Sequence, residues 1–225
     1  MEGHQTTLVE QLDAEVRSRH LLQHPFYQDW QAGRLGRDAL RLYAEQYYRH
    51  VEAFPRHLRT LAARAEDPAL RALVEENLAE EENPAAPHPQ LWRDFAAAVG
   101  ADGAALDGAA PLDGTRKLVD TYARICREGS MAEAVAALYV YEAQVPEIAT
   151  EKISGLRQFY GVNDGKGMAY FAVHEEADVR HRAAWREWLA GHDEGDRAGV
   201  VRAAEEALGA LWGILDAVHQ KNSCQ

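Results

Sequence analysis

The chain has 225 residues, of which 47% are hydrophobic and 27% are charged, and its formal net charge at pH 7 is -12. The length is enough for one large domain with its own core. The acidic balance argues against nucleic acid or an anionic membrane surface as the main partner. No apolar stretch approaches the roughly 20 residues that a membrane span needs.

The first half of the chain repeats its apolar residues with a period of about 3.6, which is typical of amphipathic helices. A Pro follows His24, and Pro68 follows Asp67, so helix boundaries are expected at both places. Pro55 is expected to start or kink a helix. The predicted helical segments are residues 7–22, 26–33, 37–54, 55–62 and 67–78.

The second half begins with a stretch rich in Gly and Ala, residues 100–114, which is predicted to be a long surface loop. Helices are expected to resume near residues 115, 131, 146, 168 and 196, and no convincing series of strands appears. Neither half has a complete set of helices, so residues 1–225 are predicted to form a single all-α domain.

The cellular location is inferred from the cysteines and the N-terminus. Cys126 and Cys224 are too few for a disulfide framework. Residues 1–7 lack the basic and apolar regions of a secretory signal. A reducing cytoplasm therefore fits the sequence best.

The most informative motif is formed by His174, Asp178 and His181, which lie at positions i, i+4 and i+7 of one predicted helix. They share a face with Phe171 and Trp185, so this face is expected to turn toward the core. Buried titratable groups need a partner. A divalent metal satisfies two neutral imidazoles and a carboxylate together, so the motif predicts a metal site.

Further acids and histidines are less distinctive by themselves. Glu142 ends an apolar run, where it is either a solvent-facing carboxylate or a buried one. Glu81 and His88 are seven residues apart, but prolines lie between them, so the helix either bends or ends and restarts. His50 and His57 have the same spacing, and nothing else supports them as ligands.

Lys152 is unusual because it projects from the apolar arc of a predicted helix, where leucine or methionine is normal. One interpretation is a lysine that extends along the surface to bring its ammonium to water. The other is a desolvated amine with a lowered pKa, which is available as a nucleophile or amino donor.

These residues together resemble the ligand set of the haem-oxygenase-like dinuclear metal oxidases. The resemblance is closest to the chlamydial proteins that associate with death domains and to related self-sacrificing 4-aminobenzoate synthases. It extends from about Thr7 to Leu215 and includes Tyr141 beside Glu142. The residues that carry it are Tyr27, Tyr43, Glu81, His88, Glu142, Lys152, His174, Asp178 and His181.

The resemblance implies an all-α, haem-oxygenase-like (TENA/PqqC-like) bundle of about seven or eight helices. It implies two transition metal ions, as Fe/Fe or Mn/Fe, held by the three acids and three histidines. Dioxygen and an external reductant would be co-substrates. Tyr27 would supply the ring of 4-aminobenzoate for folate synthesis and Lys152 its nitrogen, with Tyr43 as a radical relay or alternative ring source. A homodimer is a possible assembly.

Other functions on the same fold remain open. A dinuclear metal oxygenase acting on a separate substrate, such as a fatty acid or an amine, would use the same ligands. A cofactorless oxidase of the pyrroloquinoline-quinone type is disfavoured by the complete ligand set. A thiaminase is disfavoured because Cys126 has no nearby histidine in the sequence. A binding module would need a distinctive exposed helix face, and none is found.

Overall fold

The computed structural model describes residues 6–192 and 195–223, and all the regular elements in that part of the chain are helical. The prediction of an all-α fold is confirmed. The elements are α1 (Leu8–Ser18), η1 (Leu21–Gln23, a 3₁₀ turn), α2 (Pro25–Gln31), α3 (Arg37–Arg64), α4 (Pro68–Glu81), α5 (His88–Ala98), α6 (Gly103–Gly108), α7 (Asp113–Glu128), α8 (Met131–Glu142), α9 (Val145–Gln158), α10 (Gly165–Gly191) and α11 (Arg197–Ser223).

The starts of several helices are fixed by local side-chain caps. Thr7 and Ser130 each form a capping box with the glutamate three residues later, at the starts of α1 and α8. Asp67 caps α4, with Pro68 in its first turn, and Asp164 caps α10. These signals explain why the helix boundaries lie close to those expected from the sequence.

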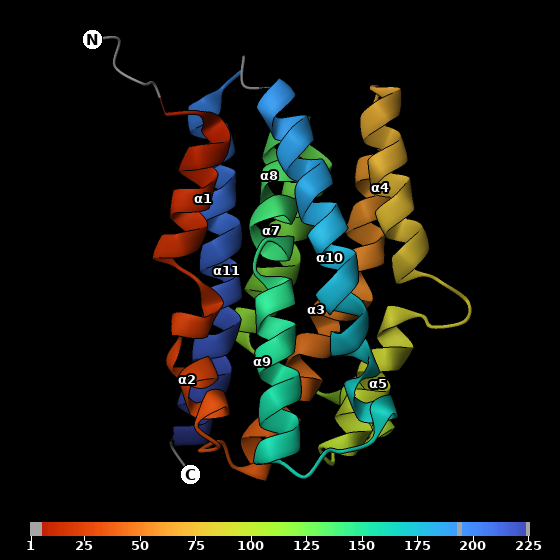
Figure 1. Cartoon of the computed structure of the whole chain (residues 1–225), viewed down its shortest axis with the longest axis vertical. Helices are drawn as coiled ribbons and strands as arrows, with labels where there is room; N and C mark the ends of the chain where they lie inside the picture. Colours follow the sequence, from red (N-terminus) through yellow and green to blue (C-terminus); the bar gives the residue numbers. More distant parts are fainter. Residues whose placement is uncertain (1–5, 193–194, 224–225) are drawn as a thin grey trace.

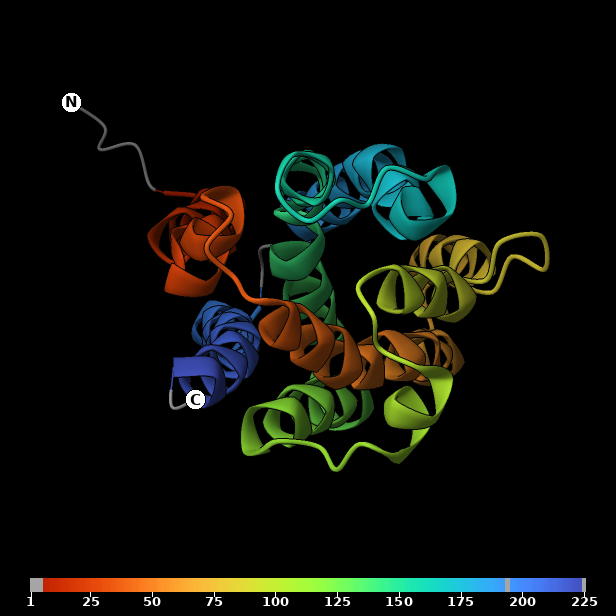
Figure 2. The same ribbon diagram turned by 90° about the horizontal axis from the view of Figure 1, so that it is seen from below.

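The helices run close to the long axis of the molecule (Figure 1), and the view along that axis shows α8 surrounded by the others (Figure 2). α8 packs against α11, α10 and α7. Every residue of α8 from Ala134 to Glu142 is buried. A helix enclosed on all sides has no solvent-facing stripe, which explains the apolar run that precedes Glu142.

Two expectations about single segments need correction. Pro55 does not start a new helix, because α3 continues from Arg37 to Arg64 with this proline inside it, and a kink there stays a prediction. The stretch from 100 to 114 is not a continuous loop, because α6 forms there with Asp102 as its N-cap. Short helices such as α2 and α6 make the described part of the chain richer in separate helices than the seven or eight expected.

The break between α4 and α5 answers the question raised by the prolines. α4 ends at Glu81, and α5 begins at His88 with Pro89 in its first turn. The helix therefore ends and restarts, so Glu81 and His88 lie at facing ends of two helices. Among the described residues, no helix is both long and apolar enough to cross a membrane. Cys224 lies outside the described residues.

Candidate metal centre

Two groups of three side chains, from four helices, could each hold a metal ion. One group contains Glu81, His88 and His174, and the other contains Glu142, Asp178 and His181. Within each group the candidate ligand atoms lie within 4.8 Å of one another, and all six residues are buried. The residues come from α4, α5, α8 and α10. The structure thus brings together all six ligand candidates from the sequence.

The motif on α10 is divided between the two groups. His174 faces α5, where its ring centroid lies 4.6 Å from that of His88. One and two turns later, Asp178 and His181 face Glu142, with His181 Nδ1 at 3.4 Å from Asp178 Oδ1 and 3.8 Å from Glu142 Oε2. A single helix therefore connects both groups, which suits a pair of neighbouring metal ions.

Several polar atoms of these residues are buried without a hydrogen-bond partner. They include Asp178 Oδ2 and both ring nitrogens of His181. Nδ1 of His88 lies 2.9 Å from Glu81 Oε2 but lacks the alignment of a hydrogen bond. Buried polar atoms are nearly always paired in folded proteins. Oxygen and imidazole donors left free in this way fit iron or manganese.

Other side chains fix the orientation of the candidate ligands. Asn77 Nδ2 donates to Glu142 Oε1 at 2.9 Å, and Trp185 Nε1 donates to Glu142 Oε2 at 2.6 Å. His174 Nδ1 donates to the Tyr170 carbonyl at 2.5 Å, which leaves Nε2 of that ring for a ligand. Sequence reasoning missed the roles of Asn77 and Trp185. Helix spacing could have indicated both residues. Asn77 lies four residues before Glu81, and Trp185 lies four residues after His181, each on the same helix face as that ligand candidate.

Burial shifts the pKa of most of these groups, whereas at His181 the lowering by burial is exceeded by the carboxylates of Asp178 and Glu142, which raise the pKa to about 9. Burial and the neighbouring charge of Asp178 raise the pKa of Glu142. Burial also raises the pKa of Asp178. Burial and the nearby His88 lower the pKa of His174 to about 3, so its imidazole is neutral and able to bind a metal. A divalent cation would allow both carboxylates to ionise inside the protein.

A second polar cluster joins α2, α3 and α9. Lys152 Nζ donates to Tyr43 Oη at 2.6 Å, and Tyr43 Oη lies 3.3 Å from Tyr27 Oη. Lys152 is only 4% exposed, and no carboxylate among the described residues pairs with it. Burial lowers its pKa to about 7. Its amine therefore ends against a tyrosine hydroxyl inside the protein and does not extend to water.

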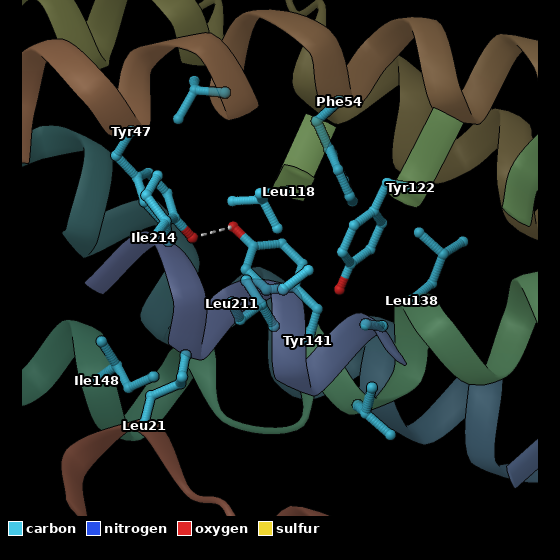
Figure 3. Packing of buried hydrophobic residues seen from close by; sticks show 14 of the residues in the cluster. Leu21, Tyr47, Phe54, Leu118, Tyr122, Leu138, Tyr141, Ile148, Leu211 and Ile214 are labelled. Atoms are coloured by element: carbon cyan, nitrogen blue, oxygen red, sulfur yellow. Dashed lines mark hydrogen bonds between the residues drawn. The ribbon is translucent and has the colours of Figure 1, made fainter. Parts of the chain in front are cut away.

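A small, largely enclosed cavity lies between the two clusters. Its volume is about 20 Å³. Tyr27 and Lys152 line it from one side, and Tyr170 and His174 line it from the metal side. Figure 3 shows part of its wall, where the Tyr47 hydroxyl bonds to that of Tyr141 at 3.3 Å. A volume of this size admits a molecule such as water or dioxygen, but not an aromatic ring.

Trp92 fills the space between the metal side and the tyrosines. Its ring centroid lies 4.8 Å from that of Tyr170 and 5.8 Å from that of Tyr43. Its Nε1 donates to the Ala44 carbonyl at 2.8 Å. The rings of Tyr170 and His174 are 4.3 Å apart. Aromatic side chains are therefore in contact from a candidate ligand to Tyr43.

The remaining candidates lie outside both groups. His50 is buried against Tyr122 and Tyr141, and neither ring nitrogen has a hydrogen-bond partner. Burial, with the neighbouring His57, lowers the pKa of His50 to about 3. No carboxylate joins these two histidines in a metal-capable group of the described residues. Burial raises the pKa of Cys126 to about 12, so its thiol stays protonated.

Comparison with known proteins gives consistent matches. Residues 41–212 match the model of a haem-oxygenase-related family described as iron-containing redox enzymes. The chain is 41% identical to a 4-aminobenzoate synthase of Nitrosomonas europaea, covering 97% of this chain and 93% of that protein. It is 38% identical to the 4-aminobenzoate synthase of Chlamydia muridarum, covering 96% and 92%.

Among solved structures, a TenA homologue from Pseudomonas syringae has the same fold, with a TM-score of 0.81. Its sequence is 17% identical, and the match covers 95% of this chain and 93% of that one. The prediction of a haem-oxygenase-like, TENA-like fold is confirmed.

Proposed function

The chain belongs to the haem-oxygenase-like family of iron-containing redox enzymes, and we propose that it forms 4-aminobenzoate. The observation that carries this proposal is the joint position of two metal-capable groups and a buried lysine–tyrosine cluster around one closed cavity. The relatives named 4-aminobenzoate synthase support the product, and the geometry supports the way in which it is made.

Six residues would hold the metal ions, either two irons or one manganese and one iron: Glu81, His88, Glu142, His174, Asp178 and His181. When bound, such a metal pair would catalyse the oxidation of an aromatic substrate by dioxygen, with electrons from an external reductant. Asn77 and Trp185 hold the Glu142 carboxylate in place, and the Tyr170 carbonyl fixes the ring of His174.

Lys152 is suited to act as the nitrogen donor. With a pKa near 7, a large share of its side chain is the neutral amine at physiological pH. A neutral amine has the lone pair that a nucleophile needs. The hydroxyl of Tyr43, at 2.6 Å, is positioned to exchange a proton with it. Both side chains are buried, which keeps bulk water from this contact.

The ring of the product would come from the protein itself. In the closed state of this structure, a cavity of about 20 Å³ has no room for a separate aromatic precursor beside the tyrosine rings. Two tyrosine rings, Tyr27 and Tyr43, already line or adjoin it within reach of Lys152. We take Tyr27 as the ring that is consumed and Tyr43 as the relay or alternative source. Such an enzyme completes a single turnover, and the product would serve folate synthesis in the cytoplasm.

The test is a reaction with purified protein loaded with iron, or with manganese and iron, plus a reductant and dioxygen. No aromatic precursor is added. The expected yield is no more than one 4-aminobenzoate per chain, with ring-labelled tyrosine in the chain giving labelled product. Mass analysis should find the change in the peptide that contains Tyr27. Many products per chain from an added substrate, with Tyr27 intact, would instead show an oxygenase with a separate substrate.

A further inference from the structure

The enclosed cavity raises the question of how an aromatic acid leaves it. A second hollow of about 530 Å³ is open to solvent and is bounded by residues of α1, α8, α9 and α10 and by His20. The residues that line it are next to those that line the cavity. His20 lines the hollow and Leu21 the cavity, and the same holds for Glu147 and Ile148. The two spaces therefore adjoin at the η1 turn and the start of α9, and we call this boundary the wall.

Gln144 holds this wall together. It is fully buried, and its Oε1 accepts a hydrogen bond from the Leu21 amide at 2.8 Å. Its Nε2 donates to the Val140 carbonyl at 2.7 Å. One side chain thus connects the η1 turn to the junction of α8 and α9. Leu21 and Ile148 lie beside each other at this point (Figure 3). The bond to Leu21 joins the turn to the junction, and the bond to Val140 orients the Gln144 side chain for it, so loss of both would loosen the turn from the junction.

The hollow is lined by both apolar and charged side chains, with more arginines than acids. Val16, Ala143 and Val179 are among its apolar residues. The charged residues around it are Asp13, Arg17, His20, Glu147, Arg182 and Arg186. Its volume is within the range of pockets that bind small molecules. Aliphatic side chains together with arginines in one hollow suit an aromatic acid.

One of the two acids of the hollow is paired with an arginine, since Asp13 lies 2.6 Å from Arg186. Glu147 lies 3.3 Å from His20, but burial lowers the pKa of this histidine, so Glu147 keeps its negative charge. Within residues 6–192 and 195–223, neither Arg17 nor Arg182 has a carboxylate partner. Although the chain has a net charge of -12, these two arginines at one hollow are available to bind an anion.

Arg182 lies directly beside the wall. Its Nη1 donates to the carbonyl of Ala143 at 3.3 Å, and Ala143 precedes Gln144 in the chain. A guanidinium group has five N–H donors, so most remain free for another acceptor. Paired N–H groups of arginine match the two oxygens of a carboxylate.

We propose that this hollow, which we call the exit hollow, binds the carboxylate of an aromatic acid through Arg182 and Arg17. The proposal rests on the function proposed above, because the acid is its product, 4-aminobenzoate. The product leaves the cavity when the η1 turn separates from Gln144, and the two arginines receive its carboxylate on the way to solvent.

Another hollow, between α9 and α10, provides a comparison. Its volume is about 650 Å³, and its lining includes one arginine, Arg157, and one glutamate, Glu175. It also lies near the cavity, because Ile153, which lines this hollow, follows Lys152, which lines the cavity. Passage there would require two long, closely packed helices to separate, which costs many contacts. Arg157 is therefore the matched control for Arg182.

Binding can be measured without the reaction, on full-length metal-loaded protein kept free of dioxygen and reductant. The probes are 4-aminobenzoate, benzoate and aniline, which lacks the carboxylate. We expect both acids to bind and aniline to bind much more weakly. Arg182→Gln should weaken benzoate binding about tenfold, the effect of one lost charged contact, and Arg157→Gln should leave it unchanged. Equal loss in both variants, equal binding of aniline, or no binding of benzoate would overturn the proposal.

The wall is tested with Gln144→Met, which keeps the length of the side chain but removes both hydrogen bonds. The Leu21 amide should then exchange its hydrogen faster, because its acceptor is lost. In a single turnover, product should leave this variant faster than the unmodified protein. Unchanged exchange and release would contradict the role of the wall. If no 4-aminobenzoate forms in any variant, the proposed function fails, while the benzoate measurement still decides whether the exit hollow binds carboxylates.

Discussion

The candidate metal ligands and the lysine–tyrosine cluster are both polar and buried, but they differ in charge. The ligand groups contain three acids, and atoms of Asp178 and His181 lack partners. The other cluster contains one amine and two hydroxyls joined by hydrogen bonds. Burial is tolerated in the first case if a cation is present, and in the second if the amine loses its proton. The first cluster should therefore depend on metal for its order, and the second should not.

The largest effect is expected from breaking the metal side. In His174→Ala, the imidazole of one group is lost, so most of the bound metal should be lost and product should fall below detection. Elemental analysis measures the metal, and circular dichroism checks that the helices remain. His192→Ala, an exposed histidine at the end of α10, is the control and should keep its metal. Full occupancy in His174→Ala would refute the assignment.

Breaking the other cluster should abolish the product without removing metal. In Lys152→Arg the charge is kept, but a guanidinium stays protonated and cannot donate nitrogen as an amine does. Metal content should match that of the unmodified protein, because Lys152 is not in either ligand group. Product is measured by chromatography after a single turnover. Undiminished 4-aminobenzoate in this variant would remove Lys152 from the mechanism.

The residues behind the ligands should have an intermediate effect. Trp185→Phe removes the hydrogen bond to Glu142 Oε2 but keeps an aromatic ring. Metal affinity should fall by roughly 10- to 100-fold, which is typical of lost partners of metal ligands. Competition with a chelator measures this change. Trp188→Phe, on the same helix, loses only a bond to Asp67 and is the control. Equal affinities in both variants would show that Trp185 only fills space.

The last effect leaves metal and product aside and concerns the stability cost of the buried amine. The pKa of Lys152 falls from 10.5 to about 7 on folding, so the unfolded chain binds more protons between these pH values. Folded-state stability should therefore rise with pH over this window. Lys152→Met should be more stable than the unmodified chain at pH 7 by a few kcal/mol, with the difference shrinking toward pH 10. Thermal unfolding at several pH values measures it, and a constant difference would contradict the lowered pKa.

The sequence by itself determined the features that depend on local spacing. The helical period and the caps placed most helices, and the spacing of His174, Asp178 and His181 placed them on one face of α10. The position of Lys152 within an apolar arc was equally visible, and the structure places that side chain in the interior. α6 was missed because a stretch rich in Gly and Ala has weak helix signals, although Asp102 was a usable cap.

Only the tertiary structure decided which residues meet. His50 and His57 are seven residues apart, like His174 and His181, but the helices around them bring aromatic rings and not carboxylates. Spacing could not choose Glu81 from its acidic run, whereas the restart of the chain at α5 places it beside His88. The sequence likewise does not show the volume of the cavity, or that Arg17 and Arg182 meet at one hollow. The physical reason is that helix geometry fixes neighbours within a few residues, whereas contacts between helices depend on how the whole core packs.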